Sequence, residues 1–139
     1  MILLDTNLLS ELLRPSPDRK VMSWFDSQPR ASLFTTTVTK AEILYGVSLL
    51  PEGQRKTALQ QAVLEVFATD MAGRMLPFDE DAATAYASIA ASRKQAGSPI
   101  SQFDAMIAAI AACHGAILAT RNIKDFQSCG IELINPWQD

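Results

Sequence analysis

The chain opens with MILLDTNLLSELL (residues 1–13), and this stretch decides the fold class. Its first four residues are apolar and lead into Asp5, a pattern typical of a short buried strand. Leucines then recur at helical spacing, at positions 8, 9, 12 and 13. The sequence therefore predicts a strand over residues 1–4 and a helix over residues 6–13. Asp5 is expected at the junction, at the carboxyl end of the strand.

The same alternation of apolar runs and helical patterns continues along the chain. Further strands are predicted at residues 32–37, 74–78, 116–120 and 131–134. Helices are predicted after the capping residue Asp18, ending before Pro29, and at residues 38–50, 54–68, 80–96 and 102–113. Strands that alternate with helices favour right-handed crossovers and a parallel sheet. We expect an α/β/α sandwich with a mainly parallel sheet of about four to five strands, in one domain spanning residues 1–139.

Composition limits the classes of protein that the chain can represent. With 48% apolar residues and a net charge of -3, it can build a core, but it lacks the basic surface of a protein that coats nucleic acid. A nuclease remains possible because bound cations reverse the field of a carboxylate cluster. The start shows no secretion signal, and the longest apolar run is too short for a membrane span. These features predict a cytoplasmic protein that does not bind membranes.

The two cysteines do not form a disulfide framework. Cys113 lies in the apolar run AMIAAIAACHGAILA. Because free cysteine packs as a small hydrophobic residue, Cys113 is expected to be buried.

Four acids stand near the predicted helix starts: Asp5, Glu42, Asp104 and Asp125. Asp5, Glu42 and Asp125 follow predicted strands closely, so a parallel sheet would bring them to one edge. Asp104 has no strand directly before it, which leaves its placement less secure. Carboxylates gathered at one point repel one another, and oxygen ligands without nitrogen or sulfur suit Mg²⁺ or Mn²⁺.

Helix capping offers a simpler explanation for each acid alone. Three acids follow a Ser, Thr or Asn by three residues, as in a capping box or a close variant of it, and the three pairs are Thr39 with Glu42, Ser101 with Asp104, and Asn122 with Asp125. A carboxylate in the first turn also suits the helix dipole. Capping would not by itself select acids that crowd together, so both interpretations stay open for each position.

Absent motifs narrow the chemistry further. His114 is the single histidine, so a histidine-rich metal site cannot form. It is expected at the carboxyl end of a helix, where a cation is favoured. The sequence contains neither a glycine-rich phosphate loop nor a nucleophile elbow. Hydrolysis assisted by a divalent metal ion is the chemistry that these residues support.

Four blocks resemble, in order and spacing, the PIN-domain proteins of the VapC type, and they are MILLDTN (1–7), TKAEILYG (39–46), DAMIAA (104–109) and ATRNIKDF (119–126). Two further blocks, LPFD (76–79) and NPW (135–137), are similar to the FitB-like branch of that family. The resemblance covers essentially the whole chain. It implies a ribonuclease that depends on Mg²⁺ or Mn²⁺, forms a homodimer and acts as the toxin of a type II toxin–antitoxin pair.

The resemblance also assigns roles to individual residues. Catalysis and metal binding carry over to Asp5, Glu42 and Asp104. Thr6 or Asn7 is implied to support the first acid, and Thr120 to line the pocket.

One position departs from the family pattern. Many relatives have aspartate after Thr-Arg, where this chain has Asn122. Asp125, one helical turn later, either completes the metal site or only caps its helix. Arg121 and Lys124 flank this segment and are candidates for contacts with RNA phosphates.

Three alternative functions were compared with this interpretation. A phosphatase of the haloacid-dehalogenase type needs a second aspartate where this chain has Asn7, and a receiver domain needs adjacent acids where it has Thr6. A PIN-like binding or regulatory protein with little catalysis remains open because of Asn122.

A toxin also implies an inhibitor. We expect a cognate antitoxin that lies over the helices at residues 6–13 and 38–50 and inserts an Arg or Lys near Asp5 and Glu42, because a guanidinium can bind two carboxylates at once. Apolar positions expected to be partly exposed there are Leu9, Leu13, Trp24 and Phe25.

Overall fold

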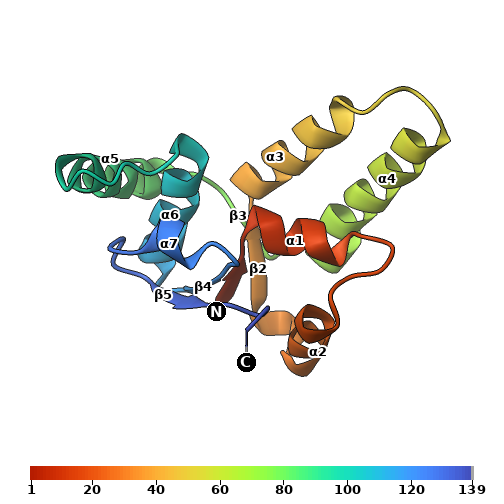
Figure 1. The fold of residues 1–139 in the computed structure, drawn as a ribbon, viewed down its shortest axis with the longest axis horizontal. Coiled ribbons are helices and arrows are strands. Elements are labelled where there is room, and N and C mark those ends of the chain that lie inside the picture. The colour runs from red at the N-terminus through yellow and green to blue at the C-terminus, as the bar shows by residue number, and fades with distance from the viewer. Residues whose placement is uncertain (139) are drawn as a thin grey trace.

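The computed structural model describes residues 1–138 and contains one sheet between two groups of helices (Figure 1). The sheet order is β3-β2-β1-β4-β5, and every strand pair is parallel. The strands are β1 (Ile2–Leu4), β2 (Leu33–Thr36), β3 (Met75–Leu76), β4 (Ile117–Ala119) and β5 (Glu132–Ile134). The predicted α/β/α sandwich with a parallel sheet is confirmed. Within the described residues, no helix is long and apolar enough to cross a membrane.

Seven α-helices connect these strands within residues 1–138. They are α1 (Thr6–Leu12), α2 (Arg19–Ser27), α3 (Thr37–Ser48), α4 (Gln54–Glu65), α5 (Glu80–Gln95), α6 (Gln102–His114) and α7 (Ile123–Phe126). The sequence predicted the first six to within a few residues at each end. The segment between the last two strands, where Asn122 and Asp125 were expected at a helix start, forms α7, a helix of four residues.

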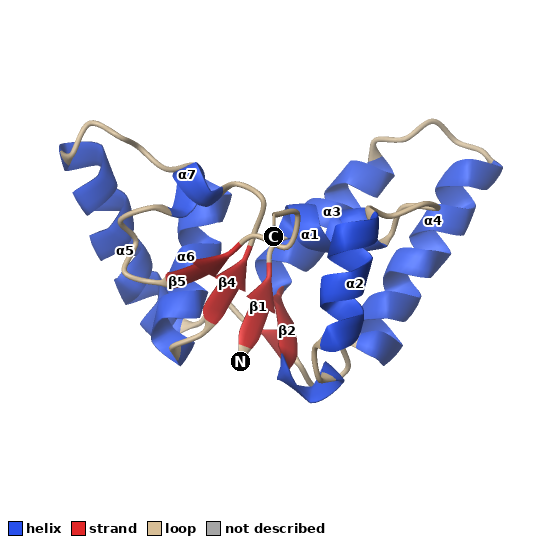
Figure 2. Cartoon of the chain, turned by 60° about the horizontal axis from the view of Figure 1, so that its bottom comes forward, coloured by secondary structure: helices blue, strands red, loops and turns tan. Residues whose placement is uncertain are grey.

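Each face of the sheet has its own core. On one face, α5 and α6 pack over the inward side chains of Leu3 and Leu118. On the other, α1 to α4 surround Leu4 and Leu33. Figure 2 shows these two groups of helices diverging from the strands between them. Adjacent residues of β1 therefore serve opposite cores, as expected for a strand covered on both faces.

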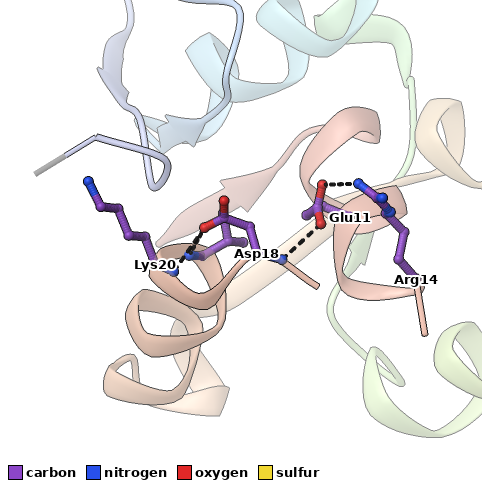
Figure 3. Close-up of polar contacts among 5 residues, drawn as sticks. Glu11, Arg14, Asp18 and Lys20 are labelled. Atoms are coloured by element: carbon purple, nitrogen blue, oxygen red, sulfur yellow. Dashed lines mark hydrogen bonds and ion pairs between the residues drawn. The ribbon is translucent and has the colours of Figure 1, made fainter. Parts of the chain in front are cut away.

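The connection from α1 to α2 is fixed by a buried carboxylate, that of Glu11 (Figure 3). It accepts hydrogen bonds from the Arg14 guanidinium at 3.2 Å and from the Asp18 N–H at 3.0 Å. Asp18 caps α2 as predicted, because its carboxylate accepts the N–H groups of Lys20 at 2.8 Å and Val21 at 3.2 Å. This chain of contacts holds the loop that follows α1 in one position.

The prediction for Cys113 was wrong. Its side chain is exposed, and Cys129 is the buried cysteine. Cys113 lies in the last turn of α6, on the side turned to solvent, whereas Ala111 two residues earlier is fully buried. The apolar run that contains Cys113 therefore includes residues outside the core. His114 is the last residue of α6, as predicted.

Candidate active site at the carboxyl edge of the sheet

Asp5 connects the central strand β1 with its neighbour β4 at the edge of the sheet where both strands end. It follows β1 directly and is 3% exposed. Its N–H donates to the carbonyl of Ala119 at the end of β4 (3.2 Å), and its carboxylate accepts the N–H of Leu8 at 2.8 Å, which caps α1. The Thr120 side chain also hydrogen-bonds the carboxylate. The backbone bond to Ala119 and the two bonds to the carboxylate thus fix Asp5 between β1 and β4.

Glu42 reaches the same edge from the second turn of α3. The helix begins directly after β2, with Thr36 as its cap, so the Thr39 N–H donates to the Thr36 hydroxyl at 3.0 Å. Glu42 is therefore not the acid of a capping box with Thr39, and the simpler explanation fails here. The Thr6 hydroxyl donates to Glu42 Oε1 at 2.6 Å and lies 3.1 Å from the Thr39 hydroxyl. Thr6, which was expected to support Asp5, supports Glu42 in the structure.

Asp104 comes from the start of α6. Ser101 caps this helix, because the Asp104 N–H donates to the Ser101 hydroxyl at 3.3 Å, which is one half of the predicted capping box. Gly115 ends α6 with a left-handed turn (φ +60°), and β4 begins two residues later. The helix therefore runs back along β4, which places its start at the edge where β4 ends. This reversal explains how Asp104 reaches the site without a strand before it.

Asp125 lies at the outer side of the acids. The segment after β4 forms a turn that is stabilised by a hydrogen bond from the Asn122 N–H to the Thr120 hydroxyl at 3.0 Å. Asn122 begins α7 without a side-chain capping bond, so the predicted box with Asp125 does not form. Asp125 is exposed on α7, and its charge acts on Asp104.

The charges of these acids influence one another's pKa values. Burial raises the pKa of Asp5 to about 6, bonds from Thr120 and Leu8 oppose this shift, and the charges of Asp104 and Glu42 add to it. Burial also raises the pKa of Glu42, against its bond from Thr6, and the charge of Asp104 raises it further.

The third acid behaves in the same way. The pKa of Asp104 is raised by burial, lowered by its bond to Ser101 and raised by Asp125. Asp104 is thus the carboxylate that interacts with the other three acids.

The donor chemistry of this cluster fits a hard divalent cation, because oxygen atoms are the ligands that Mg²⁺ and Mn²⁺ prefer. Within residues 1–138, however, no three acidic, histidine or cysteine side chains are arranged as a finished metal site. The charges of Asp5, Glu42 and Asp104 act against one another, and a bound cation would relieve that repulsion.

The remaining candidates lie around this cluster. Thr120 is fully buried beside Asp5, whereas Asn7 is exposed on the first turn of α1. Arg121 is exposed and stacks over the ring of Trp137 at 5.4 Å from its centroid. Lys124 is exposed on α7. Both cations can therefore be reached from solvent.

The sequence patterns did not point to Thr36, the last residue of β2, as the cap of α3. Thr36 and Thr39 are fully buried, one as the cap of α3 and the other as a neighbour of the Thr6 hydroxyl. The signal was present, because a run of threonines at a strand end supplies hydroxyl groups to the following helix start.

Comparisons with known proteins agree with the geometry. Residues 2–129 match the PIN domain family. The chain is 41% identical to VapC ribonuclease Y4jK of Sinorhizobium fredii over 99% of each chain, and 40% identical to the toxin FitB of Neisseria gonorrhoeae over 100% of each. A solved structure of FitAB bound to an IR36 DNA fragment superposes with a TM-score of 0.93 at 40% identity, covering 100% of this chain and 97% of the other. The chain therefore belongs to the PIN domain family, and within it to the VapC-type ribonuclease toxins that include FitB.

Proposed function

We propose that this chain is a ribonuclease dependent on Mg²⁺ or Mn²⁺ and the toxin of a type II toxin–antitoxin pair. One observation carries the proposal. Three separate elements supply the acids: Asp5 follows β1, Glu42 lies on α3 and Asp104 lies on α6. The charge of Asp104 raises the pKa of both Asp5 and Glu42, and the charge of Glu42 also raises that of Asp5. Separate elements that deliver mutually repelling carboxylates to one point work against stability, which is typical of a functional site.

In this proposal, Asp5, Glu42 and Asp104 hold the metal ion, and Asp125 adds charge at the outer side. When bound, the ion supplies an activated water and a counter-charge for the phosphate under attack. Thr120 holds the Asp5 carboxylate in place through its hydrogen bond. The Thr6 hydroxyl does the same for Glu42 at 2.6 Å.

RNA reaches the site along its exposed rim. Arg121 and Lys124 flank Asn122 and are free to meet solvent, so we assign them to contacts with RNA phosphates. Asn122 offers a neutral oxygen that can hold a water near the acids.

The direct test is cleavage of a structured RNA by the purified chain without any partner protein. We expect cleavage with Mg²⁺ or Mn²⁺, loss of cleavage with EDTA, and recovery when either ion is restored in excess. Absence of cleavage by a folded protein under all three conditions would favour the alternative, a PIN-like binding or regulatory protein, for which Asn122 is the supporting feature.

A groove supports the proposed antitoxin. It has a volume of about 590 Å³, lies between α1, α3 and α4, and extends from Thr6 and Glu42 to Leu50 and Arg55. Its walls are largely apolar, as expected for a groove that receives an amphipathic helix or an extended tail. The position of Leu9 was predicted wrongly, because this side chain is buried and unavailable to a partner.

The antitoxin is proposed to lie in this groove and to insert an Arg or Lys between Glu42 and Asp5. We further propose that the chain is one domain and forms a homodimer, acting in the cytoplasm. Expression alone should stop growth and bulk translation, and co-expression with the partner encoded beside it should restore both. Normal growth with folded, soluble protein in the native host would contradict the toxin assignment.

A further inference from the structure

Arg93 is a buried cation that the sequence analysis did not single out. It lies on α5, is 5% exposed and forms no ion pair with a carboxylate among the described residues. Arginine keeps its charge in proteins, and burial of an unpaired charge is costly. Its neighbours must therefore satisfy the guanidinium with dipoles.

Backbone carbonyls supply most of those dipoles. Arg93 Nε donates to the carbonyl of Ser98 at 2.7 Å, and Nη2 lies 3.4 Å from the Ser98 hydroxyl. Nη1 donates to the carbonyls of Asp125 at 2.8 Å and Gln127 at 3.0 Å, and lies 3.5 Å from the Cys129 sulfur. One guanidinium thus ties together two segments that are distant in sequence.

Each of these segments carries an acid of the candidate site. Ser98 lies three residues before Ser101, the cap of the helix that presents Asp104. The second segment is the end of α7, which carries Asp125, and the two acids interact through their charges.

We propose that Arg93 is a positioning residue that fixes Asp125 relative to Asp104. This inference rests on the proposed function, because Asp125 matters for catalysis only if the chain cleaves RNA. Arginine suits the role because its rigid planar group presents donors in two directions at once. Lysine keeps the charge but offers one nitrogen, which cannot reach both segments.

The first test measures hydrogen exchange in the metal-free chain and needs no activity. In Arg93→Lys, amides of residues 121–130 should exchange at least about tenfold faster, because the carbonyls of Asp125 and Gln127 lose their donors. Lys94→Gln is the matched control, since Lys94 is the exposed neighbour on α5. Unchanged exchange over residues 121–130 in Arg93→Lys would overturn the proposal.

A second variant covers a failure of Arg93→Lys to fold. Ser98→Gly removes the hydroxyl at 3.4 Å from Nη2 and loosens the carbonyl that Nε binds. Exchange over residues 121–130 should then rise about two- to threefold. The absence of any rise would overturn the proposal in this variant also.

The second test is a double-mutant cycle on RNA cleavage. Arg93→Lys should lower kcat about tenfold with KM for RNA unchanged, and should add little in the Asp125→Asn background. An equal loss of kcat in both backgrounds would show that Arg93 does not act through Asp125. Absence of cleavage by the wild-type chain would contradict the proposed function, and the exchange measurement would then decide the role of Arg93 alone.

Discussion

The two faces of the sheet are packed differently. One face supports two of the acids, and the other borders a groove in which a partner can bind. The face under α5 and α6 contains four fully buried alanines beside larger buried side chains such as Ile107, Ile110 and Leu118, and the alanines are Ala105, Ala108, Ala109 and Ala111. The face under α1 to α4 borders the groove of about 590 Å³ and a second cavity of about 360 Å³. The face under α5 and α6 carries Asp104, Asp125 and the positioning residue Arg93. The face under α1 to α4 carries Glu42 at one end of the groove, which offers room for a partner. The alanine-rich face thus supports two of the acids, and the cavities on the other face leave a surface that a partner can bind.

The largest expected effect compares a leucine from each face. Leu118 is fully buried on the face under α5 and α6, so Leu118→Ala should lower the free energy of unfolding by about 2–5 kcal/mol. Leu59 is half-buried and lines the groove, so Leu59→Ala should lower it by about 1 kcal/mol or less. Urea denaturation of both variants measures the difference. Equal losses would contradict the distinction between the faces.

The next effect concerns the site that both faces share. The pKa of Asp5 is about 6 in the fold against 3.8 ordinarily, so the fold favours its neutral form. That preference stabilises the fold below pH 3.8 and is lost as the pH rises through about 6. Without metal, Asp5→Asn should therefore be more stable than wild type at pH 7, by about 1–3 kcal/mol, and similar to it at pH 4.

Chemical denaturation with EDTA at both pH values checks this. Asparagine retains the capping of α1, so the sign of the change is informative. Equal stability of Asp5→Asn and wild type at pH 7 would mean that Asp5 serves only as a cap, because asparagine caps a helix about as well as aspartate.

The smallest effect tests the bond between α1 and α3. Thr6→Val removes the hydroxyl that donates to Glu42 Oε1 at 2.6 Å while preserving the shape of the side chain. Cleavage should fall about tenfold, as for other groups that orient a metal ligand, and stability should change by about 1 kcal/mol or less. Thr57→Val, an exposed threonine on α4, is the control. Wild-type activity in Thr6→Val would remove Thr6 from the site.

The sequence predicted most of the fold because its strands and helices have clear periodicity and clear stops. The run before Asp5 and the leucines after it were sufficient to place β1 and α1. Asp18 was predicted as a helix cap, and it accepts the N–H groups of Lys20 and Val21 in the following helix. The exposure of Cys113 was missed because an apolar run does not reveal which of its residues extend past the core.

The candidate site was predictable in composition but not in detail. Motif resemblance identified the acids, but their neighbours depend on tertiary contacts. The Thr6 hydroxyl donates to Glu42 because α1 and α3 pack together. The spacing of residues in the sequence does not reveal that packing. Arg93 bonds to residues up to 36 positions away, so local patterns give no sign of it.

Asp104 is the acid that interacts with the other three, so the proposed metal site depends on it most. The decisive measurement is single-turnover RNA cleavage with Mn²⁺ by wild type, Asp104→Asn and the control Asp81→Asn on exposed α5 surface. Asparagine keeps the N–H bond to Ser101, so the fold should be retained and circular dichroism should confirm it. We predict that Asp104→Asn loses cleavage by about a hundredfold or more while Asp81→Asn matches wild type. Full cleavage by the folded Asp104→Asn protein would contradict the account.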